Sequence, residues 1–283
     1  MRNFVVLGKN GAFARSFQNL ITEQQLGNCL SIPFSTFRSE NLNFTSFLRG
    51  EIIYVFTFGG KNQIYQISEE EQMLIKLLKN LPISEKARSS LIYLSSGEIY
   101  GNNTEPYELS QIDPVSAYGI VKANCESIIL ENGTKVMKQI KIFRIANAYD
   151  CKNVNLQRNL IANIVLQLQK KRKLSITSSL QSRKQYGTFS DYVKFIIEAI
   201  SSGTAIETSR NITITNVAPN FSYSIAEILG IFEQKFPEAI SLKNYFQTQG
   251  TSLPLESREL FSLLPSQFHW SRLEDELMQI TQI

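Results

Sequence analysis

The stretch RNFVVLGKNGAFARSFQNLITEQQL, at residues 2–26, decides the fold of this chain of 283 amino acids. It opens with an unbroken apolar run at residues 3–7, which is typical of a strand buried on both faces. Gly8 ends the run. Apolar residues then recur at helical spacing from residue 12 to residue 26, so a helix is predicted after the turn. The stretch therefore predicts the first strand and helix of an α/β protein.

The same alternation continues along the chain. Apolar runs that predict further buried strands lie at residues 29–32, 52–58, 91–95, 140–145 and 212–216. Helical patterns separate most of them. Two long helices are predicted, one at 69–81 that ends near Pro82 and one at 117–132 that ends at Gly133. We therefore expect the α/β class, with a doubly wound parallel sheet of the Rossmann type and helices on both faces.

Composition excludes several functional classes. The net charge of +4 is small for this length, and the densest basic run, at 170–173, has no interleaved aromatic residues to stack on bases. The three cysteines are widely spaced and form no Cys/His metal pattern, so neither a disulfide framework nor a metal site is predicted. No apolar stretch is long enough to span a membrane. We expect a cytoplasmic protein that binds neither nucleic acid nor membrane.

The glycine turn is the first candidate site. It reads GKNGAFA at 8–14, and small residues at 8, 11 and 14 would let the backbone approach a pyrophosphate. The helix that follows would offer free N–H groups to the anion. A plain tight turn explains the glycines equally well, because the spacing GxxGxxA differs from GxGxxG. The residues predicted to bind a dinucleotide here are Gly8, Asn10, Gly11, Ala12 and Phe13.

Tyr118 and Lys122 form a second candidate site. They are four residues apart at the start of a predicted helix, so their side chains lie on one face. A free tyrosine has a pKa of about 10 and is a poor base near neutrality. A neighbouring ammonium and a positive nicotinamide ring would favour the phenolate and lower this pKa. On an exposed helix the same pair would be a solvated pair without function.

Two serines end a predicted strand. The segment LIYLSSGEIYG, at 91–101, places Ser95 and Ser96 where the strand stops. In open parallel sheets ligands bind beyond the carboxyl ends of the strands. Ser96 would then donate a hydrogen bond to the substrate oxygen that Tyr118 titrates. Serines at strand ends are also common turn formers, which is the alternative interpretation.

Taken together, these motifs resemble an extended short-chain dehydrogenase/reductase of the NAD(P)-dependent nucleotide-sugar epimerase/dehydratase family. The resemblance covers nearly the whole chain and depends on the order and spacing of its motifs. These are GKNGAFA at 8–14, SSGEIYG at 95–101, DPVSAYGIVKANCE at 113–126, FRIANAY at 143–149, Arg183, and NITITNVAPNFSYSIAEIL at 211–229.

The resemblance implies a role for each matching residue. Ser96, Tyr118 and Lys122 would form the catalytic triad, and Lys122 would also contact the nicotinamide ribose. Asn147 and Arg183 resemble residues that hold the diphosphate of a nucleotide sugar, a task for which a guanidinium is suited because it can contact two oxygens at once. A surface arginine beside Lys184 is the alternative for Arg183.

The residues after Ser96 bear on the type of reaction. Glu98 stands where dehydrating or decarboxylating members of the family carry a supporting carboxylate, so it is a candidate substrate-binding residue. A residue that only caps a turn is the alternative for Glu98. The Asp that often accompanies it is Gly97 here. The resemblance therefore argues against 4,6-dehydration.

The chain departs from the family around the expected adenine site. The family often ends its second strand with an acid that prefers NAD, whereas residues 31–38 contain no carboxylate. Arg38 and nearby hydroxyls could accept a 2′-phosphate, which favours NADP over NAD. The short segment at 33–50 leaves little room for one family strand. Thr57, in the segment FTFGG at 56–60, is expected to lie against the dinucleotide.

The resemblance implies two lobes and a reaction. A dinucleotide-binding lobe is expected from residues 1–146 and 188–217, and a smaller α/β substrate-binding lobe from 147–187 and 218–283. The expected reaction is hydride transfer at C4 of the sugar, either reduction of a 4-keto sugar or 4-epimerisation. A catalytically silent relative that binds the dinucleotide as a sensor or partner protein is the alternative. A homodimer built on the helices at 69–81 and 117–132 is also implied.

Overall fold

The computed structural model describes most of the chain, and side-chain statements are limited to these parts. They are residues 2–39, 48–57, 64–81, 83–103, 105–151, 159–170, 176, 179–202, 206–209, 211–237 and 268–278. Within them, no helix is both long and apolar enough to cross a membrane.

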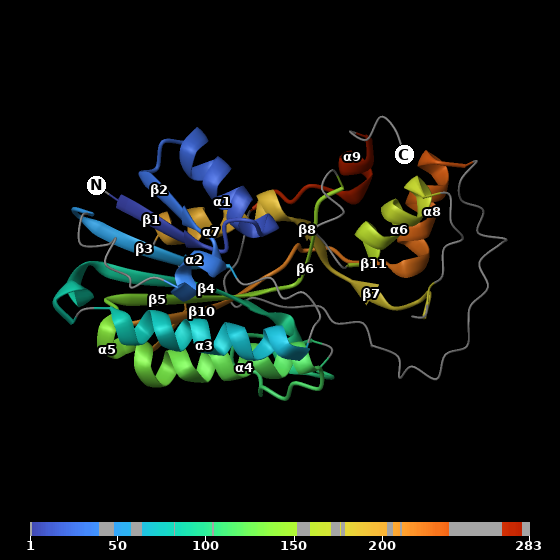
Figure 1. The fold of residues 1–283 in the computed structure, drawn as a ribbon. Helices are drawn as coiled ribbons and strands as arrows, with labels where there is room; N and C mark the ends of the chain where they lie inside the picture. The colour runs from blue at the N-terminus through green and yellow to red at the C-terminus, as the bar shows by residue number, and fades with distance from the viewer. Residues whose placement is uncertain are drawn as a thin grey trace.

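A seven-stranded sheet forms the centre of the molecule (Figure 1). The strand order is β2-β1-β3-β4-β5-β10-β9. The first six strands run parallel to one another, and β9 pairs antiparallel with β10. The strands are β1 (Arg2–Leu7), β2 (Asn28–Ile32), β3 (Glu51–Phe56), β4 (Ser89–Ser96), β5 (Gln139–Ile145), β9 (Ile206–Ser209) and β10 (Ile212–Val217). The predicted doubly wound parallel sheet is confirmed.

The central strands of the sheet are buried on both faces. Every residue of β4 and β10 is buried, as are all but the first residues of β1, β3 and β5, whereas most of the outer strand β2 is partly or fully exposed. Alternate residues of one strand enter different clusters, so Val5 and Leu7 pack on one face and Phe4 and Val6 on the other. On the first face α3 (Ile64–Asn80) and α4 (Ala117–Ile128) lie side by side over the sheet, as Figure 1 shows. On the second face lie α1 (Ala12–Glu23) and α7 (Phe189–Ser202).

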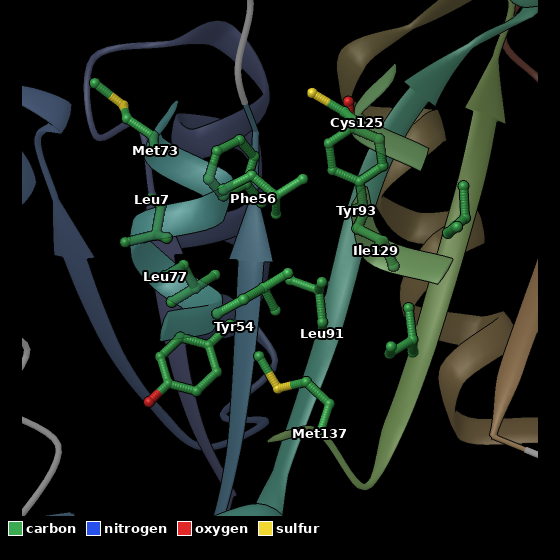
Figure 2. Close-up of a cluster of buried hydrophobic side chains, with 14 of the residues drawn as sticks. Leu7, Tyr54, Phe56, Met73, Leu77, Leu91, Tyr93, Cys125, Ile129 and Met137 are labelled. Atoms are coloured by element: carbon green, nitrogen blue, oxygen red, sulfur yellow. The ribbon is translucent and has the colours of Figure 1, made fainter. Parts of the chain in front are cut away.

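Figure 2 shows the first of these clusters. Residues of β3 and β4, such as Phe56 and Tyr93, meet Met73 and Leu77 of α3 between the sheet and the helices. Tyr93 points its ring toward Cys125 of α4. The contact between α3, α4 and β4 places the start of α4 over the carboxyl end of β4, which matters for the site.

The end of α4 differs from the prediction. Gly133 does not stop the helix, because the chain passes through a π turn at Ile129–Gly133 and continues as α5 (Thr134–Val136). A Cβ atom on Gly133 would lie 2.5 Å from Ile140 Cδ1. The glycine thus allows close packing against β5 rather than a left-handed helix end.

A second group of elements packs around its own apolar cluster (Figure 1, right). It contains two small sheets, one pairing β6 with β8 and one pairing β7 with β11. Their members are β6 (Asn147–Tyr149), β7 (Arg183–Lys184), β8 (Tyr186–Thr188) and β11 (Tyr223–Ser224), with the helices α6 (Leu160–Gln169), α8 (Ile225–Lys235) and α9 (Leu273–Met278). The chain enters this group directly from the carboxyl end of β5.

Candidate active site

The glycine turn lies where the order of the strands reverses. From β1 the chain runs outward to β2 and then returns across β1 to β3. Gly8 has φ +105°, a region that favours glycine, and a Cβ atom there would lie 2.8 Å from Phe34 Cε2 and 2.9 Å from Thr57 Oγ1. Its N–H donates to the carbonyl oxygen of Ile32 at 2.9 Å. The backbone of the turn is therefore packed tightly against the ends of the neighbouring strands.

The N-terminus of α1 opens directly from this turn. Gly11 is the N-cap residue and supplies no side-chain hydrogen bond, and the first turn of the helix has no acidic residue. No side chain of the described residues is recorded as capping the first N–H groups of this 12-residue helix, and these groups carry the positive end of the helix dipole. The turn thus fits the pyrophosphate of a dinucleotide.

The other residues predicted for this turn differ in what they can offer. Asn10 is exposed at the turn. The ring of Phe13 packs edge-on against Phe189 at 4.7 Å between ring centroids, and against Tyr192 at 6.2 Å. Phe13 and Ala12, both in the first turn of α1, can therefore contribute backbone N–H groups, while the Phe13 ring joins α1 to α7.

Thr57 follows the last residue of β3 and is buried. Its hydroxyl donates to the carbonyl oxygen of Leu7 at 2.8 Å, which ties the end of β3 to the end of β1. Arg38 lies in α2 (Phe34–Ser39), and the structure describes its backbone but not its side chain. Its contact with a 2′-phosphate remains a prediction.

Ser96 ends β4, the next strand along the sheet. All eight residues of β4 are buried. Ser96 is the N-cap of the short helix η3 (Gly97–Tyr100), and its Oγ accepts a hydrogen bond from the Glu98 N–H at 3.2 Å. The backbone of Ser96 is therefore held by β4, and its hydroxyl is held by the Glu98 N–H of η3.

The first turn of α4 is placed close to η3. Ser116 is the N-cap residue and accepts from the Gly119 N–H at 3.0 Å. Its hydroxyl also donates to Glu98 Oε2 at 3.1 Å. A Cβ atom on Gly119 would lie 2.5 Å from the carbonyl oxygen of Glu98, so only a glycine allows this approach. This contact brings Tyr118 beside the end of β4.

Tyr118 is surrounded by groups with opposing effects on its pKa. Burial raises the pKa, Lys122 lowers it, Glu70 raises it, a hydrogen bond with Ser96 lowers it and Glu98 raises it, and the net result lies above the ordinary value. Sequence reasoning expected Lys122 to move this pKa toward neutrality. Lys122 acts in that direction, but burial outweighs it.

Lys122 is almost fully buried, with 1% of its side chain exposed. Its Nζ lies 5.6 Å from the centroid of the Tyr118 ring. The ammonium donates to Glu70 Oε1 at 2.6 Å and to the carbonyl oxygen of Leu94 at 2.9 Å. Glu70 was missed from the sequence, although it interrupts the apolar stripe of α3, and a carboxylate on such a stripe signals a buried partner.

The structure thus brings Ser96, Glu98, Tyr118 and Lys122 together at the carboxyl end of β4. The glycine turn and Thr57 follow β1 and β3, the next two strands in the sheet. Both groups therefore lie at the carboxyl ends of adjacent parallel strands, which is where sheets of this type bind their ligands.

Asn147 and Arg183 lie in the second group of elements. Asn147 begins β6, and its Nδ2 donates to the carbonyl oxygen of Gln185 at 3.1 Å. Arg183 donates to Ser222 Oγ at 2.9 Å, to the Ser222 carbonyl oxygen at 2.7 Å and to Glu227 Oε2 at 3.1 Å. Its side chain is 42% exposed, so the guanidinium is held by protein groups and also reaches solvent.

A second buried charge pair supports the site and was also missed. Arg144 of β5 donates to both carboxylate oxygens of Glu126 on α4, at 2.7 and 3.2 Å. It also donates to the Tyr100 hydroxyl at 2.6 Å, and Ser95 donates to the same Glu126. This network ties α4 to the strands on either side of the site.

Residues 52–218 match the model of the NAD dependent epimerase/dehydratase family. Among curated proteins, no sequence matches.

Solved structures share the fold. MoeE5 in complex with UDP-glucose and NAD superposes with a TM-score of 0.75 at 13% identity, covering 98% of this chain and 96% of that one. UDP-glucose 4-epimerase from Thermotoga maritima gives 0.72 at 16% identity, with 97% and 96% covered. UDP-glucuronic acid 4-epimerase from Bacillus cereus, in complex with NAD, gives 0.70 at 16% identity, with 97% and 94% covered. Because the family model spans more than half of the sequence, this chain belongs to the NAD dependent epimerase/dehydratase family.

Proposed function

We propose that this enzyme uses NAD or NADP to oxidise or reduce C4 of a nucleotide-linked sugar, either as a 4-keto reductase or as a 4-epimerase. One observation carries the proposal: Ser96, Tyr118 and Lys122 lie together at the carboxyl ends of the parallel strands, as the glycine turn does. A phenol, an ammonium and a hydroxyl in this arrangement can move one proton on and off a substrate oxygen.

Tyr118 is the acid/base in this proposal. In the oxidative direction its phenolate takes the proton of the sugar hydroxyl, and in the reductive direction the phenol gives a proton to the ketone oxygen. Bound nicotinamide would accept or supply the hydride. Since burial raises the pKa of Tyr118, the phenol form prevails near neutrality. In this form Tyr118 can give its proton to a ketone oxygen, which is the reductive step.

Ser96 would hold the substrate oxygen beside Tyr118. Its hydroxyl is within hydrogen-bonding reach of Tyr118, so one oxygen between them could contact both groups. Glu98 is anchored by Ser116 and would contact a neighbouring part of the sugar. Gly97 offers no carboxylate there, which argues against 4,6-dehydration.

The second group of elements would bind the nucleotide diphosphate. We assign residues 147–187 and 218–283 to this substrate lobe, and residues 1–146 and 188–217 to the dinucleotide lobe. Arg183 would contact the diphosphate through the exposed side of its guanidinium, and Asn147 would assist. The fold is shared with MoeE5 and the T. maritima epimerase, both solved with UDP-glucose, which supports a nucleotide sugar as substrate.

The cofactor is proposed to be NADP or NAD. Arg38 and the absence of an acid in residues 31–38 favour NADP. The complexes of MoeE5 and the B. cereus epimerase contain NAD, which supports NAD. The turn at Gly8 serves either dinucleotide, because it contacts the pyrophosphate.

The test combines binding with turnover. NADH and NADPH are titrated by fluorescence. Reduction of 4-keto hexoses is followed at 340 nm, and 4-epimerisation of UDP- and dTDP-linked hexoses is followed by proton NMR, because an epimerase returns the hydride to the sugar and leaves no net change at 340 nm. We expect binding of a dinucleotide and turnover of at least one sugar in one of the two assays. Binding with neither reduction nor epimerisation of any sugar would instead favour a silent sensor or partner protein. No binding of either dinucleotide would refute both functions.

A further inference from the structure

Glu70 stands on the apolar face of α3. It lies in register with Met73, Leu74 and Leu77, which pack against the sheet at spacings of three, four and seven residues. The Glu70 side chain is only 2% exposed. A carboxylate in such surroundings is stable only when it is paired and hydrogen-bonded.

Its partners come from two other elements. The Lys122 ammonium on α4 donates to Glu70 Oε1 at 2.6 Å, and the Tyr93 hydroxyl on β4 donates to the same oxygen at 2.9 Å. Lys122 also donates to the carbonyl oxygen of Leu94 on β4. The ammonium is thus held between α3 and β4.

We propose that Glu70 is a positioning residue, which keeps Lys122 charged and fixed beside Tyr118. The inference rests on the proposed function of Tyr118 and Lys122. Glu70 itself need touch neither substrate nor dinucleotide, because it acts through Lys122.

The charge of Lys122 depends on Glu70. Burial by itself lowers the pKa of this lysine, while Glu70, Tyr118 and Cys125 raise it, and the net pKa lies above the ordinary value. Without the carboxylate, burial would favour the neutral amine. A neutral amine could not stabilise the phenolate of Tyr118.

Glu70 also acts on Tyr118 directly. Its negative charge raises the pKa of Tyr118, as Glu98 does from η3, whereas Lys122 lowers it. Two further titratable neighbours of Lys122 among the described residues are Tyr93, whose pKa is raised, and Cys125, whose pKa is raised to about 12, so both stay neutral near neutral pH. Glu70, Lys122 and Glu98 are thus charges of the described residues that act on the protonation of Tyr118.

The test compares Glu70→Gln with Glu71→Gln. Glutamine keeps the size of the side chain and an oxygen that can accept from Lys122, but removes the charge. Glu71 is the next residue of the same helix, and its carboxylate accepts from Asn124 on α4 rather than from Lys122. The pKa of Lys122 is read in the full chain from the Cε signal of ¹³C-lysine, assigned by its loss in Lys122→Arg.

We expect the titration midpoint of Lys122 to fall by on the order of one pH unit or more in E70Q, because an opposite charge this close stabilises the ammonium. E71Q should match the wild type. In turnover assays of E70Q, both limbs of the pH–rate profile should move to lower pH. The pKa of Tyr118 falls because a negative neighbour is lost, and the pKa of Lys122 falls because its ammonium is no longer stabilised. A role confined to packing would lower kcat without moving either limb.

Glu70→Asp guards against a folding defect in E70Q. It keeps the charge but withdraws it by one methylene, so its Lys122 midpoint should lie between those of E70Q and E71Q. The inference is overturned if the Lys122 midpoint in E70Q equals the midpoint in E71Q. If E70Q does not fold, the same comparison is made with E70D. The titration needs neither dinucleotide nor sugar, so it can succeed where the turnover assays refute the proposed function, and the two failures are distinguishable.

Discussion

Tyr118 receives opposing influences from a small set of side chains. Lys122 and Ser96 favour its phenolate, while burial, Glu70 and Glu98 favour its phenol. Burial is the largest of these influences, so the net pKa of Tyr118 lies above the ordinary value and the phenol is the favoured form. Its sequence position shows the pair with Lys122 but not the opposing carboxylates, because those come from α3 and η3.

Tyr118→Phe removes the hydroxyl while keeping the ring. We expect kcat to fall by about 10²–10⁴-fold, the usual contribution of a positioned acid/base. Dinucleotide binding should remain, since the glycine turn is unchanged. Turnover of a sugar nucleotide and fluorescence titration of the dinucleotide measure the two effects.

Tyr107→Phe is the matched control, because Tyr107 is 45% exposed and lies in the segment between η3 and α4, where its backbone N–H donates to Ser110. It should leave both measurements unchanged. Full turnover in Tyr118→Phe would exclude Tyr118 as the acid/base.

At the scale of elements, the sequence predicts the six parallel strands well. Each run gathers apolar or β-branched residues over four or more consecutive positions, so the pattern is local and does not depend on partners far away in the chain. The short strands β6, β7, β8 and β11 could not be predicted in this way, because two or three residues show no periodicity. The helix end at Gly133 was predicted wrongly, since a glycine required for close packing resembles a glycine required for a left-handed turn.

The candidate site divides along the same line. Ser96, Tyr118 and Lys122 lie within short motifs, and the sequence places them correctly at the end of β4 and the start of α4. Glu70 and Arg144 act over separations of 52 and 18 residues. Their partners are fixed only by how α3, α4 and β5 pack. The sequence therefore shows a charged residue within an apolar pattern, but it does not show which residue pairs with that charge.

The approach of α4 to η3 can be tested with two glycines. Gly119→Ala places a methyl group against the Glu98 carbonyl, so we expect a loss of about 1–3 kcal/mol in the free energy of unfolding, together with lower kcat. Gly230 lies inside α8, and a Cβ atom added there would have no heavy atom within 4 Å among the described residues. Gly230→Ala should therefore add about 0.5–1 kcal/mol.

Urea denaturation followed by circular dichroism measures both variants. Equal stability of Gly119→Ala and the wild type would contradict the close contact between α4 and η3. A destabilised Gly230→Ala would contradict the open surroundings of that glycine.

The link between α4 and β5 depends on a buried charge pair. Glu126→Gln leaves the Arg144 guanidinium without a compensating charge, and we expect a loss of about 3–5 kcal/mol. The exposed pair of Arg2 and Glu51, at 3.4 Å, is the control. Glu51→Gln should cost only about 0–1 kcal/mol, because solvent screens the pair. Equal losses in the two variants, measured by chemical denaturation, would contradict the role of the buried pair.

At the scale of the whole molecule, one face remains to be explained. The sheet is covered by helices on both sides, yet α4 and the π turn that continues it carry the exposed apolar residues Ile120 and Leu130, at 46% and 43% exposure. The family resemblance implies a homodimer in which α3 and α4 form a four-helix bundle with their copies. Such a bundle would cover these two side chains.

Ile120→Asp tests this dimer. A charge at the centre of a helical interface must be desolvated without a partner, so the variant should be monomeric where the wild type is dimeric. Met278→Asp, at an equally apolar but 71% exposed residue of α9, should remain dimeric. Sedimentation equilibrium over a range of concentrations measures the molecular mass of all three proteins. A wild-type protein that is monomeric throughout, or a dimer that survives Ile120→Asp, would show that the exposed face of α4 does not hold the subunits together.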